Sequence, residues 1–129
     1  MVMKKETKEW LNISKEDKEV AEMTWKTKRY IYAIMFWQQA VEKIIKAYIV
    51  EVINVLPRKT HDIDQLLEQA KLNIIEIKIK DTKEITKAFM RTRYEDLSRK
   101  YYSDKKKVEP LIKQAQRIYL WIEKLLKNL

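Results

Sequence analysis

The sequence predicts an all-α fold, an up-and-down bundle of about five helices. It contains no glycine and only two prolines in 129 residues, so few residues interrupt a helix. Good helix formers such as Lys, Glu, Leu and Ala are abundant, and apolar residues recur three and four apart in its longest segments. The length predicts a single domain over residues 1–129, large enough for a buried core but too short for two.

The first predicted helix covers about residues 5–26. Its inward stripe, with residues three and four apart, comprises Trp10, Ile13, Asp17, Val20 and Thr24. A buried carboxylate without a partner is costly, so Asp17 is expected to contact a cation or a hydrogen-bond donor. The alternative is that Ser14 and Asp17 form a local capping box that starts the helix later.

The second predicted helix, over about residues 29–53, carries the most informative pattern. Gln38, Glu42 and Lys46 lie four apart and share one face, while Gln39 and Lys43 form a second row beside it. The rest of the circumference is apolar and comprises Ile34, Trp37, Ala40, Val41, Ile44, Ile45, Tyr48 and Ile49. This pattern is typical of a central helix that is buried on most sides and presents one polar strip. The alternative is that both rows are solvated salt-bridge partners.

The second helix is followed by residues that end one helix and start another. Asn54 suits a left-handed helix end, and Pro57 prevents continuation of the helix. Thr60 is the expected N-cap of a third helix that ends near Asn73, with acidic residues in its first turns.

Residues 74–80 alternate like a strand but have no second strand to pair with, so they are expected to form a connector or a helical extension. The Asp-Thr-Lys-Glu run at residues 81–84 is a capping box that opens a fourth helix. That helix is expected to turn Ile85, Ala88 and Phe89 inward.

The last helix has the clearest periodicity. Its apolar seam steps by three and four through Val108, Leu111, Ala115, Ile118, Ile122, Leu125 and Leu129. Pro110 is expected in the first turn. Tyr119, Trp121 and Leu126 form a second apolar edge, which fits either a partner surface or an additional core contact. The predicted core of the whole bundle is Trp10, Ile34, Trp37, Val41, Ile44, Tyr48, Leu66, Phe89, Leu111, Ile118, Ile122 and Leu125.

Four segments occur in an order that is typical of one family. They are Trp10 with Glu16 and Asp17, residues 38–47, the Thr-His-Asp-Ile run at residues 60–63, and Arg93 with Tyr94. The sequence in these segments resembles the HEPN family, small helical domains whose second helix reads much like QQA-x-EK-x-x-KA and whose third opens with Thr-His-Asp. Many single-domain members carry Arg-Tyr-Pro where this chain has Arg-Tyr-Glu, so the turn-forming proline is missing.

The resemblance raises the question of ribonuclease activity, which the residues of this chain do not support. Many HEPN members are metal-independent ribonucleases in which an Arg holds the scissile phosphate and a His, separated from it by four to six residues, moves a proton. Here Arg91, Arg93 and Arg99 have no histidine after them, and Arg58 is too close to His61. Cleavage of that type is therefore not expected, and the chain is not expected to be an enzyme.

Single-domain HEPN proteins like this one are often encoded beside a minimal nucleotidyltransferase, with which they form a two-component system of toxin–antitoxin type. The resemblance thus implies a non-catalytic module that forms a homodimer and binds a nucleotide, the minimal nucleotidyltransferase, or both. The alternatives are an RNA-binding helical module and a degenerate HEPN ribonuclease that has lost its Arg-x(4-6)-His motif.

The charge of the chain favours an anionic ligand. The formal net charge is +9, which attracts phosphates, nucleic acid or an acidic partner. Between residues 91 and 107 seven basic residues stand against three acidic ones, with Tyr94, Tyr101 and Tyr102 among them. Basic residues interleaved with aromatic ones bind nucleotides and single strands by charge and stacking. The same composition also fits a lysine-rich connector between helices.

The expected binding site is a polar cleft between the second helix and the end of the fourth. Its candidate nucleotide- or phosphate-binding residues are Arg93, Tyr94, Gln38, Lys43, Arg91 and Lys105, and its supporting polar residues are Asp17, Glu42 and His61. Asp17 is expected to hold Arg93 in place. The alternative is that these two form a salt bridge that only fixes helix packing, and that His61 is a surface or interface group.

The composition also indicates which kinds of site and segment are not expected in this chain. A chain without glycine has no P-loop, and one without cysteine has no thiol nucleophile, so no catalytic residue, cofactor or metal is expected. No signal peptide follows Met1, and the longest apolar run, residues 31–37, is too short to span a bilayer. A cytoplasmic protein without membrane association is therefore expected. Lys and Ile richness with 36% charged residues is typical of a thermophile.

Overall fold

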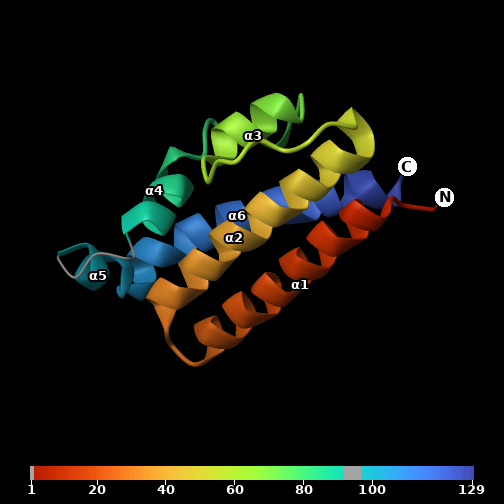
Figure 1. Cartoon of the computed structure of the whole chain (residues 1–129). Helices are drawn as coiled ribbons and strands as arrows, with labels where there is room; N and C mark the ends of the chain where they lie inside the picture. Colours follow the sequence, from red (N-terminus) through yellow and green to blue (C-terminus); the bar gives the residue numbers. More distant parts are fainter. Residues whose placement is uncertain (1, 92–96) are drawn as a thin grey trace.

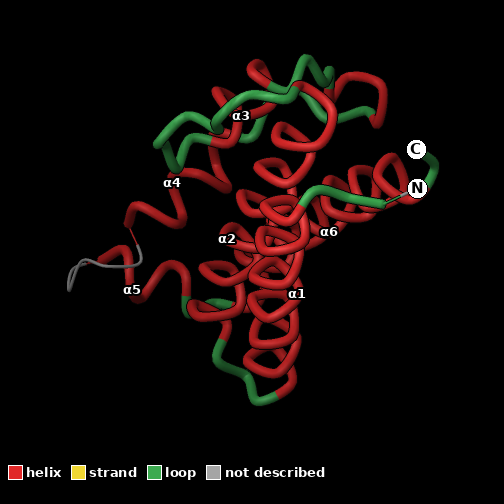
Figure 2. Tube along the Cα trace, turned by 45° about the vertical axis from the view of Figure 1, so that its right-hand side comes forward, coloured by secondary structure: helices red, strands yellow, loops and turns green. Residues whose placement is uncertain are grey.

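The structure, a computed structural model, describes residues 2–91 and 97–129. In this part of the chain it contains helices and loops but no strand, as Figure 2 shows, so the predicted all-α fold is confirmed. The elements are α1 (Lys5–Lys26), α2 (Tyr30–Tyr48), a π-helical turn η1 (Ile49–Ile53), α3 (Ile63–Gln69), a 3-10 turn η2 (Ile74–Ile77), α4 (Lys83–Arg91), α5 (Leu97–Tyr102) and α6 (Lys105–Lys127).

Helix α2 is the centre of the bundle, as its sequence predicts. It contacts each of the other α-helices described, and most extensively α1 and α6. Figure 1 shows the three long helices α1, α2 and α6 side by side, with α3 and α4 covering a second side and α5 at the end away from the two termini. Within the described residues, no helix is long and apolar enough to cross a membrane.

Helix α1 has the predicted bounds but turns a different face inward. Its fully buried residues are Thr7, Ser14 and Ala21, spaced seven apart, whereas Ile13 is 41% exposed. Small side chains let two helix backbones approach closely, so this stripe faces α2. The larger Trp10 is half-buried and packs at the edge of the core. The predicted inward position of Ile13 is therefore wrong.

The core contains buried residues from every α-helix of the described part of the chain and follows the predicted set closely. Eight of the predicted residues are buried: Ile34, Trp37, Val41, Ile44, Leu66, Phe89, Ile118 and Ile122. The other four, Trp10, Tyr48, Leu111 and Leu125, are half-buried. The second apolar edge of the last helix also faces inward, because Tyr119 and Leu126 are buried and the ring of Tyr119 packs edge-on against Trp37 at 6.0 Å between centroids.

The N-cap of α3 is Asp62 and not the predicted Thr60. Asp62 Oδ1 accepts a hydrogen bond from the backbone N–H of Gln65 at 3.2 Å, which satisfies a free donor of the first turn. Thr60 Oγ1 accepts from the backbone N–H of Asp62 at 3.1 Å and so shapes the turn before the helix. The helix ends at Gln69, four residues before the predicted Asn73.

The expected connector at residues 74–80 and the expected cap at Asp81 are confirmed, and the other corrections concern α5 and α6. Residues 74–80 form a short connector that contains η2, and Asp81 Oδ1 accepts from the backbone N–H of Lys83 at the start of α4, at 3.1 Å. The short helix α5 was not predicted. Helix α6 begins earlier than predicted, because Asp104 Oδ1 caps it by accepting from the backbone N–H of Lys106 at 2.9 Å. Pro110 therefore lies inside the helix and not in its first turn.

In the described part of this glycine-free chain, four residues adopt the left-handed conformation. They are Lys28 (φ 64°), Asn54 (φ 64°), Lys71 (φ 56°) and Lys78 (φ 61°). Each lies just after a helix or helical turn, where glycine is the usual residue. The predicted left-handed end at Asn54 is confirmed.

Candidate functional site

The carboxylate of Glu42 is the centre of a polar cluster inside the bundle. Glu42 lies on α2 and is 1% exposed. Its Oε2 lies 3.0 Å from Lys43 Nζ and 3.2 Å from Lys46 Nζ, and its Oε1 lies 2.8 Å from His61 Nδ1. We call Gln38, Glu42, Lys43, Lys46 and His61 the α2 polar cluster. The predicted row of Gln38, Glu42 and Lys46 thus faces the protein interior and is not a solvated row.

The charge state of Glu42 follows from these contacts. Burial acts to raise the pKa of Glu42, but the hydrogen bond with His61 and the charges of Lys43 and Lys46 outweigh burial and lower the pKa below its ordinary value. Glu42 is therefore a buried carboxylate anion at neutral pH. Such a group needs its cationic partners, because a buried charge without them is strongly unfavourable.

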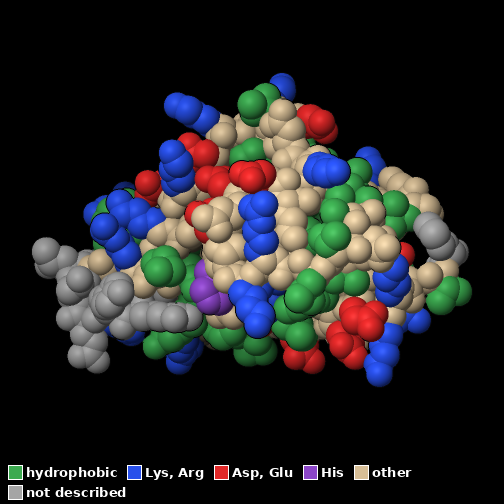
Figure 3. Space-filling model, turned by 45° about the horizontal axis from the view of Figure 1, so that its top comes forward, with side chains coloured by type: hydrophobic (Ala, Val, Ile, Leu, Met, Phe, Trp, Pro, Cys, Tyr) green, Lys and Arg blue, Asp and Glu red, His purple; other side chains and the backbone are tan. Residues whose placement is uncertain are grey.

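His61 joins this buried carboxylate to the surface. Its side chain is 54% exposed, although its Nδ1 is bound to Glu42. Figure 3 shows the histidine at the surface beside Lys and Arg side chains. The ring centroid lies 4.9 Å from that of Phe89 on α4, and the backbone carbonyl of His61 accepts a hydrogen bond from Gln38 Nε2 at 3.1 Å. The imidazole is therefore held from the side of α2 and from the side of α4.

Two buried acceptors lie at the margin of this cluster. Gln38 Oε1 and Asp17 Oδ2 are buried and have no hydrogen-bond partner among the described residues. Burial raises the pKa of Asp17 above its ordinary value, the charge of Lys43 only partly offsets this, and Glu16 and Glu42 raise the pKa further. The expected partner of Asp17, Arg93, lies outside the described residues. The cation that acts on Asp17 in the described structure is Lys43.

Asp17→Asn is expected to leave the free energy of unfolding at neutral pH unchanged or to increase it. A carboxyl with a raised pKa contributes stability below its ordinary pKa of 3.8, and this stability is lost as the pH rises through the raised pKa. The amide of the variant would be neutral at every pH, so any gain should vanish in acid. Urea unfolding at pH values on both sides of the pKa tests this, with Glu19→Gln, an exposed change on the same helix, as control. A loss above about 1 kcal/mol at neutral pH would instead show that the Asp17 carboxylate makes a strong contact.

A second group of residues forms a basic and aromatic surface on α4, α5 and the start of α6. Lys107 Nζ lies 4.5 Å from the ring centroid of Tyr101, and Arg99 Cζ lies 5.9 Å from that of Tyr32. Tyr101 is 45% exposed and packs edge-on against the buried Tyr102. A hollow of about 270 Å³ lies beside them and is lined by Glu84, Lys87, Arg91, Ser98, Tyr101 and Tyr102. We call this region the basic–aromatic surface.

The described residues of the predicted cleft make different contacts in the structure, and the cleft itself stays a prediction. Gln38 and Lys43 belong to the α2 polar cluster, where Gln38 is fully buried and the side chain of Lys43 is 17% exposed. Arg91 lines the hollow of the basic–aromatic surface. Lys105 Nζ lies 5.5 Å from the ring centroid of Trp25, where α6 begins. Arg93 and Tyr94 lie outside the described residues.

The bond between Glu42 and His61 was not predicted from the sequence. These residues are 19 positions apart, so only the packing of α3 against α2 brings them together. The available signal was the apolar sequence around the Glu42 row together with the chain's single histidine. Lys46, which was not chosen as a site residue, completes the cluster and also lies 5.3 Å from the ring centroid of Trp10.

Comparison with known proteins agrees with this architecture. A family model described as HEPN domain matches residues 7–125, which is nearly the whole chain. No significant match was found among curated proteins or among solved structures. The family match includes all of α2, α3, α4 and α5 and therefore both the α2 polar cluster and the basic–aromatic surface. The chain belongs to the HEPN domain family.

Proposed function

We propose that this chain is a non-catalytic nucleotide-binding module, paired with a minimal nucleotidyltransferase in a two-component system of toxin–antitoxin type. The HEPN domain match over residues 7–125 supports a role of the kind that HEPN proteins have. The missing histidine after Arg91, Arg93 and Arg99 argues against the ribonuclease mechanism of other members, since no imidazole stands at the expected spacing to move the proton.

The basic–aromatic surface is the observation that carries the nucleotide-binding part of the proposal. An exposed tyrosine ring offers a face for a base, and cations such as Lys107 and Arg99 already lie against rings at this surface. Lys87 and Arg91 line the adjacent hollow, where they can pair with phosphate oxygens. Glu84, the acidic residue among the described residues of that lining, reduces this attraction only in part.

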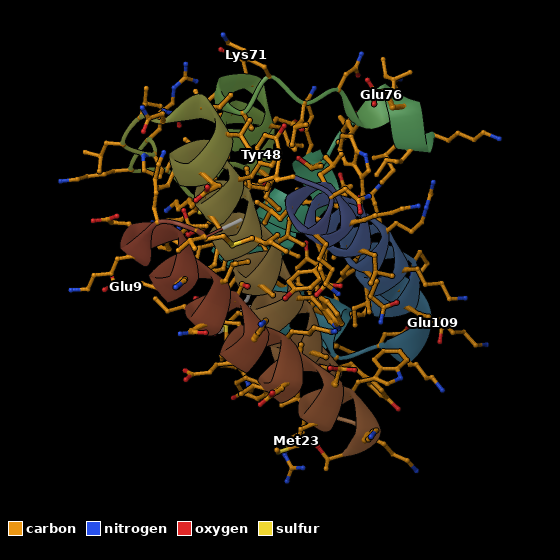
Figure 4. All side chains as sticks on the ribbon, turned by 90° about the vertical axis from the view of Figure 1, so that its right-hand side faces the viewer. Glu9, Met23, Tyr48, Lys71, Glu76 and Glu109 are labelled. Carbon is orange, nitrogen blue, oxygen red and sulfur yellow. The ribbon has the colours of Figure 1, made fainter. Side chains whose placement is uncertain are left out.

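Tyr101→Ala is expected to weaken nucleotide binding by about fivefold or more, because stacking on an aromatic side chain contributes ~1–3 kcal/mol per base. Arg91→Ala should weaken it in a salt-dependent way, since the guanidinium acts mainly by charge. The matched control is Lys71→Ala, which removes a cation at the end of the molecule opposite Met23 (Figure 4). Titration with fluorescent ATP measures all three. Equal binding by Tyr101→Ala and the parent protein would contradict the proposed site.

RNA is the second candidate ligand, and one observation favours it. Cation and ring pairs extend from Tyr32 on α2 to Tyr101 on α5, which offers more than one stacking position. A parallel titration with a short single-stranded RNA separates the two. A preference for RNA that grows with strand length would identify an RNA-binding module and displace the nucleotide as ligand.

The protein partners of the proposal are a second copy of the chain and the nucleotidyltransferase. For the homodimer, the expected result is twice the chain mass by light scattering at tens of micromolar protein. The mass of a single chain at that concentration would contradict a homodimer. Co-purification of the protein encoded by the adjacent reading frame tests the second partner directly.

A further inference from the structure

The hydrogen bond between Glu42 and His61 determines the protonation pattern of the imidazole. An ionised carboxylate can only accept a hydrogen bond, so the proton of the neutral ring lies on Nδ1, 2.8 Å from Glu42 Oε1. The electron pair of the neutral ring then lies on Nε2. The side chain as a whole is 54% exposed, so the imidazole is partly open to solvent.

The position of the imidazole is fixed independently of any ligand. The carbonyl of His61 is bound by the fully buried Gln38, its ring packs against Phe89, and the next residue, Asp62, caps α3. Lys43 and Lys46 already compensate the charge of Glu42. The histidine is therefore not needed for charge balance, and its Nε2 has no hydrogen-bond partner among the described residues.

We propose that His61 Nε2 is a phosphoryl acceptor that is modified by a small activated phosphate, such as an acyl phosphate or phosphoramidate. Three features of the site suit this chemistry. The ring is held as the tautomer with its electron pair on Nε2, in a side chain that is half exposed. A buried anion contacts the opposite nitrogen. The partly exposed Lys43 and the net charge of +9 attract an anionic donor.

In the proposed step, the electron pair of Nε2 attacks the phosphorus atom and forms an N–P bond. The bond between phosphorus and the leaving group breaks, and the leaving group departs with the bonding electrons, as a carboxylate from an acyl phosphate or as ammonia from phosphoramidate. The ring becomes cationic while it retains its Nδ1 proton. Glu42 stabilises that charge through the hydrogen bond it already makes. Nothing in this step depends on nucleotide binding at the basic–aromatic surface.

Phosphoramidate is the probe that tests this inference. Because His61 is the only histidine, ³¹P NMR and the acid lability of the product identify the modified residue without ambiguity. The parent protein is expected to react about tenfold faster than N-acetylhistidine, the scale that one charge-assisted hydrogen bond supplies. His61→Gln should not give the acid-labile product, and acetyl phosphate should give the same product as phosphoramidate.

Glu42→Gln provides the matched variant, because the amide keeps a hydrogen-bond acceptor and removes the charge. Its reaction should fall to the rate of N-acetylhistidine while its circular dichroism remains helical. If this variant does not fold, the ¹⁵N chemical shifts of the parent protein still decide the question. A dominant tautomer with the proton on Nε2 would overturn the inference. So would a parent protein that reacts no faster than N-acetylhistidine, or a folded Glu42→Gln that reacts as fast as the parent.

Discussion

Glu42→Ala is expected to lower the free energy of unfolding by about 3–5 kcal/mol, because removing one partner of a buried ion pair leaves the others uncompensated. Lys46 is 8% exposed and would lose its carboxylate 3.2 Å away. The His61 side chain would lose its hydrogen bond to α2, which leaves the bond from Gln38 to the His61 carbonyl as the other polar contact reported there. Urea unfolding followed by circular dichroism measures the loss.

The pH dependence of the same variant gives a second test. A carboxyl with a lowered pKa contributes stability above its ordinary pKa of 4.5, and this stability is lost as the pH falls through the lowered pKa. The difference between parent and Glu42→Ala should therefore be largest near neutral pH and shrink in acid. Glu68→Ala, which removes an exposed pair with Arg58, should cost less than about 1 kcal/mol. A similarly small effect of Glu42→Ala would show that the cluster does not stabilise the fold.

Ile118→Ala is the second change for which we expect a large effect, a loss of about 2–5 kcal/mol. Ile118 is fully buried on the face of α6 that packs against α2, so truncation removes apolar contacts and leaves a cavity. Leu120→Ala is the matched control, because Leu120 lies two residues further along the same helix and is 56% exposed. The control should change the stability by about 0.5 kcal/mol or less. A loss below about 1 kcal/mol at Ile118 would mean that the inward face of α6 is assigned wrongly.

Local signals predicted the ends of the first two long helices well. The bounds of α1 agree with the prediction, and α2 with η1 ends before Asn54 as expected, because these ends depend on neighbouring residues along the chain. The face of α1 was less predictable. Ile13 fits a period of three and four, but close approach to α2 requires the smaller Thr7, Ser14 and Ala21, and only the packed structure shows this requirement.

The sequence predicted several residues of the candidate site but not the contacts between them. The spacing of Gln38, Glu42 and Lys46 identified one polar face of a central helix, and that face is buried as a unit. The depth of Glu42 and its bond to His61 depend on where α3 lies, which no short-range pattern encodes. Charged rows on helices are usually solvated, so sequence spacing alone favours the wrong environment for this row. The start of α6 was missed for a related reason, since the three lysines after Asp104 resemble a connector.

The lack of glycine, even at the four described left-handed helix ends, affects the unfolded state of the chain as well as the folded one. A side chain in the left-handed region costs roughly 1 kcal/mol relative to glycine, so Lys28, Asn54, Lys71 and Lys78 each carry local strain in the folded protein. In return, an unfolded chain without glycine has fewer accessible backbone conformations. Each position that has a side chain in place of glycine, and whose native conformation suits it, therefore stabilises the folded protein by about 0.4–1 kcal/mol. This benefit arises all along the chain, whereas the strain is confined to the four described turns. Part of the stability of this bundle thus originates in the narrowed conformational freedom of the chain before any helix has formed.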